Sequence, residues 1–142
     1  MNTINNIQDQ IIEEFTVFTD WMDKYEYLID LGKDLPAMDE KLKNAQNLIA
    51  GCQSKVWINA TMHNGAVQFE ADSDAVITRG MVALLIRVYN NQTPDSILNS
   101  DLYFVDAIGL KANLSPTRAN GLLSMIKQLK YYAMAYKAVQ NK

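Results

Sequence analysis

Residues 54–72 read SKVWINATMHNGAVQFEAD, two runs of alternating apolar and polar residues joined by Asn64-Gly65. Asn-Gly tolerates the positive φ angles of a type I′ turn, so it is a strong short-range signal for a β-hairpin. Alternate residues of a strand share one face. The apolar face consists of Val56, Ile58, Ala60 and Met62 in the first run and Val67, Phe69 and Ala71 in the second. The sequence therefore predicts an antiparallel hairpin, residues 54–63 and 66–72.

Helices are needed to cover this hairpin, because an isolated hairpin is marginally stable in water. Apolar residues at helical spacing predict a first helix marked by Ile4, Ile7, Ile11, Phe15 and Phe18. Further helices are predicted from the N-cap Asp20 to the C′ residue Gly32, from the N-cap Asp74 to about residue 89, at 94–99 and 101–108, and from Pro116 to about 139.

The predicted fold is a single α+β domain, residues 1–142, in which helices pack around a small antiparallel sheet. Residues 47–50 are a candidate third, edge strand, and residues 33–47 form an irregular connection. Gly80 and Gly121 lie inside predicted helices, where glycine costs about 1 kcal/mol relative to alanine. Each of them indicates that another part of the chain packs closely against its helix.

Composition excludes several classes of protein. A single cysteine among 142 residues excludes an internal disulfide, a CxxC redox pair and a multi-cysteine zinc site. Residues 1–40 contain ten acids against Lys24 and Lys33, whereas no acid follows Asp106, so we expect the acidic N-terminal helices to pack beside the basic C-terminal helix. With a net charge of −3 and sparse basic residues, nucleic-acid binding is not expected.

The location of the protein is predicted from the same features. No basic start followed by an apolar segment is present at the N-terminus, and the longest apolar run, residues 81–86, is too short to span a bilayer. One unpaired cysteine suits a reducing compartment. We therefore expect a cytoplasmic protein that does not contact the membrane.

Cys52 is the first candidate for chemistry, because it lies where a glycine-bearing polar loop gives way to the first strand. Gly51 permits φ > 0 and removes a side chain beside the sulfur, which allows a partner to approach. The alternative is that Cys52 is a small apolar side chain that only fills space, the commonest role of a free cysteine. Reactivity requires access and a suitable pKa of the thiol.

Other catalytic groups fit less well. His63 adjoins the hairpin turn, roughly 35 Å from residue 52 if the strand is extended, so a Cys/His nucleophile pair is not expected. Asp72 and Asp74 resemble helix-capping residues more than a magnesium site. A lone thiolate can attack a sulfur–sulfur bond and be attacked in turn, and without a second cysteine its disulfide or persulfide must involve another molecule. These properties favour a carrier.

The chain resembles the SufE family, the sulfur acceptors of cysteine desulfurases in iron–sulfur cluster assembly. The resemblance covers nearly the whole length, and its most specific element is the string GCQSKVW at residues 51–57. The other matching elements are Trp21 through Tyr25 to Leu31-Gly32, DSDA at 72–75 with Gly80, and SPTR at 115–118 with Gly121.

The resemblance implies a sulfur relay. Cys52 matches the acceptor cysteine of the family, which takes a persulfide sulfur from a pyridoxal-phosphate desulfurase of the SufS type and passes it to a scaffold of the SufBCD type. Such a protein stimulates its partner enzyme, is not itself an enzyme, and binds neither cofactor nor metal. Gly51, Gln53 and Ser54 would form the supporting loop.

Asp74 and Arg118 are candidate positioning residues, since each begins a predicted helix and could fold near Cys52. The alternative for each is a local role at the helix terminus. We also expect Cys52 to rest against apolar side chains in the free protein and to swing outward when a partner docks. Two other functions remain open, namely a cluster-assembly scaffold that uses several chains per cluster, and an interaction module in which Cys52 is structural.

Overall fold

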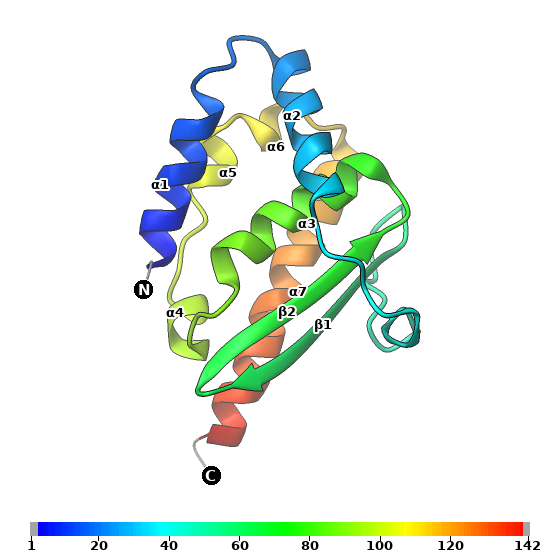
Figure 1. Ribbon diagram of the computed structural model, residues 1–142, viewed down its shortest axis with the longest axis vertical. Helices are drawn as coiled ribbons and strands as arrows, with labels where there is room; N and C mark the ends of the chain where they lie inside the picture. The colour runs from blue at the N-terminus through cyan, green and yellow to red at the C-terminus, as the bar shows by residue number, and fades with distance from the viewer. Residues whose placement is uncertain (1–2, 141–142) are drawn as a thin grey trace.

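The computed structural model describes residues 3–140 and contains an antiparallel hairpin surrounded by helices (Figure 1). Strand β1 (Val56–His63) pairs with β2 (Ala66–Ser73), with Val56 opposite Ser73 and His63 opposite Ala66. Asn64 and Gly65 have φ angles of 52° and 82°, as the predicted turn requires. The hairpin prediction is confirmed, with strand limits of 56–63 and 66–73 in place of 54–63 and 66–72.

The candidate third strand is reduced to one bridge. Leu48 pairs with Trp57 as an isolated bridge, flanked by hydrogen bonds from Ile49 N to Val56 O (2.8 Å) and from Ile58 N to Asn47 O (2.9 Å). On the other edge, Val67 N donates to Gln92 O at 2.9 Å. These short pairings cover both edges of the hairpin, which leaves less unpaired backbone for non-specific association.

Two long helices organise the molecule (Figure 1). Helix α3 (Val76–Tyr89) lies at the centre and contacts β2 and the helices α1, α2 and α7, whereas α7 (Pro116–Gln140) runs along the hairpin. Tyr132 and Tyr136 of α7 donate hydrogen bonds to Ile58 O (3.0 Å) and Ala60 O (2.8 Å) of β1. The remaining elements are α1 (Ile4–Phe15), α2 (Trp21–Lys33), the 3₁₀ turn η1 (Glu40–Leu42), α4 (Pro94–Leu98), α5 (Phe104–Ala107) and α6 (Leu110–Asn113).

Several helix limits depart from the sequence-based expectation, and three of these departures concern residues named above. Helix α1 ends at Phe15, so Phe18 lies beyond it. Gly32 is not a C′ residue but lies inside α2, where it packs against Gly80 of α3. Asp74 is not the N-cap of α3, because the cap position is Ala75 and the Asp74 carboxylate accepts a hydrogen bond from Lys55 N instead.

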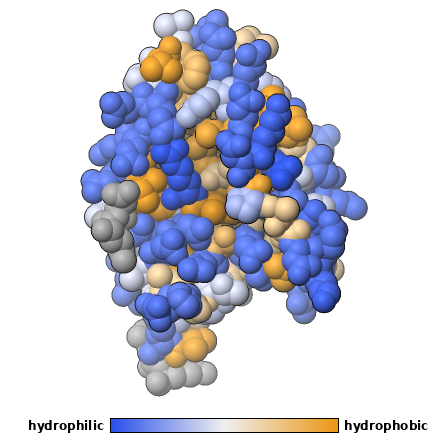
Figure 2. All heavy atoms as spheres, viewed as in Figure 1, coloured by the Kyte–Doolittle hydropathy of each residue, from blue (hydrophilic) through white to orange (hydrophobic). Residues whose placement is uncertain are grey.

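The apolar core lies between the hairpin, α1, α3 and α7, and it buries the predicted face of the hairpin apart from half-buried Met62. Figure 2 shows hydrophilic residues over most of one face of the molecule, with hydrophobic residues visible between the helices. No helix within residues 3–140 has the length and hydropathy that a membrane span requires.

The acidic N-terminal helices do not pack mainly beside the basic C-terminal helix as expected, because α1 and α2 contact chiefly α3 and α5. Glu14 of α1 pairs with Arg87 of α3, and Lys137 of α7 pairs with Asp95 of α4. Within residues 3–140, no ion pair joins α1 or α2 to α7. The reason is that α3 and α4, which carry their own charges, lie beside these helices.

Candidate functional site

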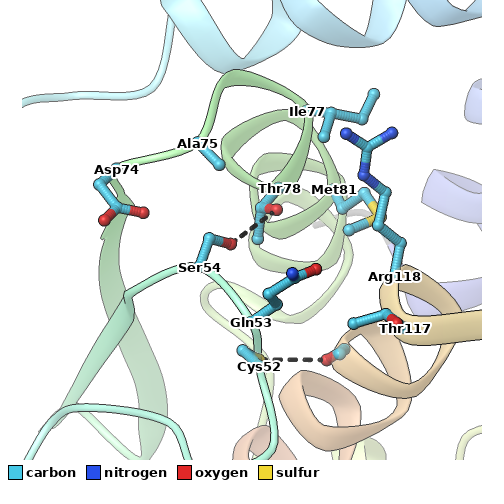
Figure 3. A pocket seen from close by; sticks show the side chains of 11 residues that line it. Cys52, Gln53, Ser54, Asp74, Ala75, Ile77, Thr78, Met81, Thr117 and Arg118 are labelled. Carbon is cyan, nitrogen blue, oxygen red and sulfur yellow. Dashed lines mark hydrogen bonds between the residues drawn. The ribbon is translucent and has the colours of Figure 1, made fainter.

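Cys52 lies on the loop between the Leu48 bridge and β1, where it is half-buried against the surface of α7 (Figure 3). Its sulfur is 3.7 Å from Gly121 O, within range of a weak S–H···O hydrogen bond. Burial raises the pKa of the Cys52 thiol, so the resting side chain favours the neutral form. Cys52 packs against the apolar core, and Ile77 and Met81 of α3 line the cavity beside it.

Gly51 allows the loop to lie this close to α7. Gly51 has a φ of +86°, and a Cβ at this position would be 2.8 Å from Ser124 Oγ. A Cβ at Gly121 would be 3.5 Å from the Cys52 sulfur, an ordinary van der Waals contact. The cysteine loop packs on Gly121, but a methyl group would fit there, so the close packing expected at this glycine is not found.

The end of the loop is held by the corner between β2 and α3. Lys55 N donates to Asp74 Oδ1 at 2.9 Å, and Lys55 O accepts hydrogen bonds from Ser73 Oγ (2.8 Å) and Asp74 N (3.1 Å). Ser54 Oγ lies 3.1 Å from Thr78 Oγ1 on the first turn of α3. The bond from Asp74 N to Lys55 O extends the pairing of the two strands by one residue, and together these contacts tie the position of Cys52 to this corner.

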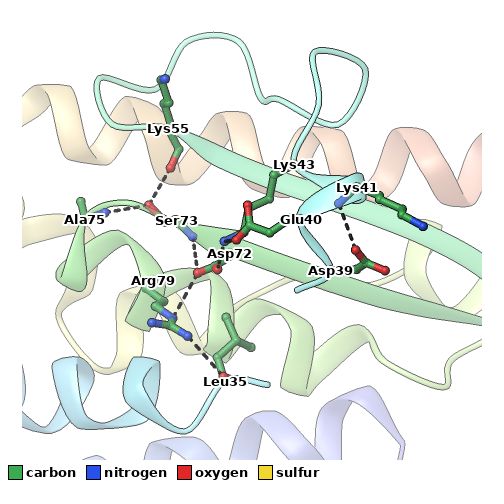
Figure 4. Close-up of polar contacts among 10 residues, drawn as sticks. All are labelled: Leu35, Asp39, Glu40, Lys41, Lys43, Lys55, Asp72, Ser73, Ala75 and Arg79. Atoms are coloured by element: carbon green, nitrogen blue, oxygen red, sulfur yellow. Dashed lines mark hydrogen bonds and ion pairs between the residues drawn. The ribbon is translucent and has the colours of Figure 1, made fainter. Parts of the chain in front are cut away.

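The segment that precedes the loop is held by a buried carboxylate, Asp72 (Figure 4). Its Oδ2 lies 3.0 Å from Lys43 Nζ, and its Oδ1 lies 3.2 Å from Arg79 Nε, an ion-pair contact whose geometry does not make a hydrogen bond. Burial acts to raise the pKa of Asp72, but Lys43, the Ser73 amide and Arg79 together hold this pKa below its ordinary value. Asp72 is therefore a structural anchor that joins Lys43 to Arg79, and it does not cap a helix.

A cavity of about 360 Å³ opens beside the thiol (Figure 3). This volume is at the lower end of the range of small-molecule pockets and far exceeds one sulfur atom. Its walls come from the cysteine loop, the β2–α3 corner and the first two turns of α7. The lining residues are Cys52, Gln53, Ser54, Asp74, Ala75, Ile77, Thr78, Met81, Thr117, Arg118 and Gly121.

The fold brings together five of the six residues singled out from the sequence. Cys52, Gln53, Ser54, Asp74 and Arg118 all line the cavity, and Gly51 lies just outside it on Ser124. Sequence reasoning missed the cavity walls contributed by α3 and by Thr117, since no local pattern distinguishes them from other helix residues.

Arg118 is also tied to helix α2. Its Nη1 donates to Tyr25 OH at 3.1 Å, and its guanidinium carbon lies 5.9 Å from the centre of the Tyr25 ring. Figure 3 shows the Gln53 side chain between the cysteine loop and Arg118. Arg118 thus places a cation at the mouth of the cavity, because its side chain is exposed.

No histidine assists the thiol in this geometry. His63 is exposed at the far end of β1, next to the hairpin turn, whereas Cys52 precedes the start of the same strand. Within residues 3–140, no group of three or more His, Cys, Asp or Glu side chains could hold a metal ion. The arrangement provides one shielded sulfur beside a cavity.

Comparison with known proteins finds sequences that share one family name. A sequence model of the SufE family, described as an Fe-S metabolism associated domain, matches residues 9–133. An uncharacterized SufE-like protein of Rhizobium etli is 40% identical over 127 residues, which cover 86% of each chain. A second one, from Synechocystis, is 39% identical over 132 residues, or 93% of this chain and 83% of the relative.

A solved structure shares the fold at low sequence identity. The solution structure of a hypothetical protein from Thermus thermophilus matches with a TM-score of 0.74 and 18% identity, covering 91% of this chain and 94% of the other. At this identity the match concerns the fold alone, and it agrees with the α+β class predicted from the sequence.

Proposed function

The chain belongs to the SufE family of proteins associated with iron–sulfur metabolism, and we propose that Cys52 is its sulfur acceptor. In this proposal a cysteine desulfurase of the SufS type donates a persulfide sulfur to Cys52, and unloading the enzyme accelerates its turnover. The observation that carries the proposal is the position of the only thiol, half-buried at the edge of a cavity between a loop and α7.

The transfer step needs no external oxidant or reductant. The Cys52 thiolate attacks the terminal sulfur of the enzyme persulfide, forming a new S–S bond while the original S–S bond breaks. The enzyme cysteine leaves as a thiolate, and the terminal sulfur carries its proton to Cys52 as Cys52–S–SH. The chain acts as carrier and activator rather than as an enzyme, and it requires no cofactor of its own.

The resting state suits a carrier because the free thiol is protected. Burial raises the pKa of Cys52, so little thiolate is present to be oxidised before a partner arrives. The same property makes the resting thiol a poor nucleophile. Docking must therefore move the sulfur out of contact with Gly121, which lowers its pKa and lets it reach the enzyme persulfide.

The loop is held weakly near Cys52 and firmly at Lys55, which permits such a movement. Its contact with α7 is one weak bond from the Cys52 sulfur and the packing of Gly51 on Ser124, whereas its end at Lys55 is held by three hydrogen bonds. We expect residues 51–53 to swing outward while Ser54 and Lys55 stay bonded to α3 and to the β2–α3 corner. Hydrogen–deuterium exchange that stays the same around residues 47–56 when a desulfurase binds would contradict this movement.

Asp74 and Arg118 are proposed as positioning residues. Asp74 holds Lys55, the fixed point of the loop, and Arg118 presents its guanidinium at the mouth of the cavity. Gln53 and Ser54 shape the loop from the same side, the latter through Thr78. From Cys52 the sulfur would pass to a SufBCD-type scaffold in the cytoplasm.

Mass spectrometry of Cys52 tests the proposal directly. The protein is incubated with a cysteine desulfurase and cysteine, then alkylated and digested. We expect a gain of one sulfur on the peptide that contains Cys52, together with faster sulfide release by the enzyme. Cys52→Ser serves as the control and should abolish both effects.

Other outcomes would favour the two alternatives. A coloured, iron-containing product assembled on the chain would indicate a scaffold. An unmodified thiol, with stimulation that persists in Cys52→Ser, would indicate an interaction module in which Cys52 is structural.

A further inference from the structure

Helix α7 has apolar residues on two opposite faces. One face is buried in the core and consists of Leu122, Met125, Leu129 and Ala133. On the other side, Leu123, Tyr131 and Met134 are 48%, 64% and 58% exposed. Single exposed apolar residues are common on protein surfaces, but these follow one another at helical spacing. With Lys127 they form a row at positions 123, 127, 131 and 134, named here the α7 stripe.

The α7 stripe carries positive charge and lacks acids. The sequence has no Asp or Glu after residue 106, and no ion pair within residues 3–140 connects the acidic helices α1 and α2 to α7. Lys130 donates to Ser100 O and Lys137 pairs with Asp95, whereas Lys127 is exposed on the stripe itself. An acidic surface with an apolar centre is the complement of such a face.

The α7 stripe continues the proposed sulfur-transfer site. Gly121 contacts the Cys52 sulfur, and Ser124 lies under Gly51, so the helix passes from the thiol directly into the stripe. With a rise of 1.5 Å per residue, Tyr131 lies about 15 Å along the helix from Gly121. A protein interface of standard size covers about 800 Å² per partner, a patch of about 16 Å radius. A donor that contacts Cys52 and extends along α7 is therefore large enough to cover the stripe as well.

We propose that the α7 stripe is the surface on which the persulfide donor docks, through an acidic patch with exposed apolar side chains next to its reactive cysteine. This inference rests on the proposed function, since it assumes that a donor protein approaches Cys52. It adds a second point of contact that fixes the donor relative to the loop. The loop can then leave α7 while the donor remains bound.

The test measures binding of a cysteine desulfurase to the full chain in the Cys52→Ser background, so that no sulfur is transferred. Lys127→Glu and Met134→Glu should each raise the dissociation constant roughly tenfold, and Tyr131→Ala by a similar factor. Val17→Glu is the matched control, because Val17 is 75% exposed on the connection between α1 and α2. It should change the constant by less than about twofold.

Salt dependence provides an independent measurement. The dissociation constant of the Cys52→Ser protein should rise as the salt concentration increases from about 0.05 to 0.3 M, because salt screens exposed charges. The rise should be less steep when Lys127→Glu is added. Equal constants for the stripe variants and the control would overturn the inference. The inference would also be overturned if the wild-type chain self-associates through the stripe. In that case the stripe variants would be monomeric and would still bind the desulfurase with the wild-type dissociation constant.

Failure of this inference is distinguishable from failure of the proposed function. If the stripe variants bind the desulfurase normally while Cys52 still gains a sulfur in the wild-type chain, the donor docks elsewhere and the relay stands. The inference would also be overturned by stripe variants that bind the donor normally but fail to pass sulfur to a scaffold. That result would make the stripe the docking surface of the scaffold.

Discussion

Two glycine-mediated contacts in this protein differ in what lies opposite them. Where α2 crosses α3, a Cβ at Gly80 would be 2.2 Å from Leu28 O, and one at Gly32 would be 2.7 Å from Gly80 N. Where the cysteine loop meets α7, a Cβ at Gly121 would be 3.5 Å from the Cys52 sulfur. The first contact joins two helix backbones, whereas the second joins a helix to a movable side chain.

The helix–helix contact contributes to the stability of the fold, whereas the loop contact leaves Cys52 able to move. At the α2–α3 crossing the two helix backbones are in contact, and neither can move to accommodate a side chain. The crossing therefore fixes the position of α3 and with it the β2–α3 corner. The loop contact adds little stability, because it consists of a weak sulfur hydrogen bond and a few van der Waals contacts. Cys52 thus rests on a rigid platform without being locked to it.

Alanine at Gly80 should have the largest effect. The new methyl group would overlap the Leu28 carbonyl, so the helices must separate, and we expect the free energy of unfolding to fall by about 3 kcal/mol. Urea denaturation measures the change. Gly121→Ala is the matched control, where alanine has the better helix propensity and the space exists. Its stability should be unchanged or up to about 1 kcal/mol higher. Similar losses in both variants would refute the comparison.

Substitution of Asp74 should have a smaller, local effect. In Asp74→Ala, Lys55 N loses its acceptor, so the loop should open more often and iodoacetamide should alkylate Cys52 several-fold faster. The loss of one partly exposed hydrogen bond lowers stability by about 1 kcal/mol.

Asp74→Asn separates geometry from charge. The amide oxygen can still accept the hydrogen bond from Lys55 N, so its alkylation rate should stay close to that of the wild-type protein. If Asp74→Asn accelerates alkylation as much as Asp74→Ala does, then the negative charge acts on the thiol and the hydrogen bond does not restrain the loop.

The sequence predicted the elements that local signals specify. The hairpin follows from Asn64-Gly65 and from alternation, and the close approach at Gly80 follows from a glycine within an apolar helix. Gly32 and Asp74 were assigned wrongly for a common reason. Each has the local signature of a helix terminus, but the actual partners, Gly80 and Lys55, lie 48 and 19 residues away in the chain.

The grouping of the candidate residues around one cavity could be predicted only in part. Cys52, Asp74 and Arg118 could be selected as residue types at loop and helix boundaries, and the fold places all three around one cavity. The burial of the thiol depends on Gly121, 69 residues later, which no local pattern reveals. The same holds for the Asp72 anchor, whose partners Lys43 and Arg79 come from an irregular segment and from α3.

The smallest expected effect concerns the pH dependence of the thiol. Burial raises the pKa of Cys52, so the alkylation rate of the native protein should reach half its maximum at a higher pH than that of the urea-unfolded chain.

The same difference in pKa makes the free energy of unfolding depend on pH. The neutral thiol is favoured in the folded state, so its contribution is complete below the unfolded pKa and is lost as the pH rises through the folded pKa. The stability of the wild-type protein relative to Cys52→Ser should therefore decrease in alkaline solution. A native midpoint below the unfolded one would mean that a nearby positive charge such as Arg118, rather than burial, controls the thiol, and that the resting loop is already primed for attack.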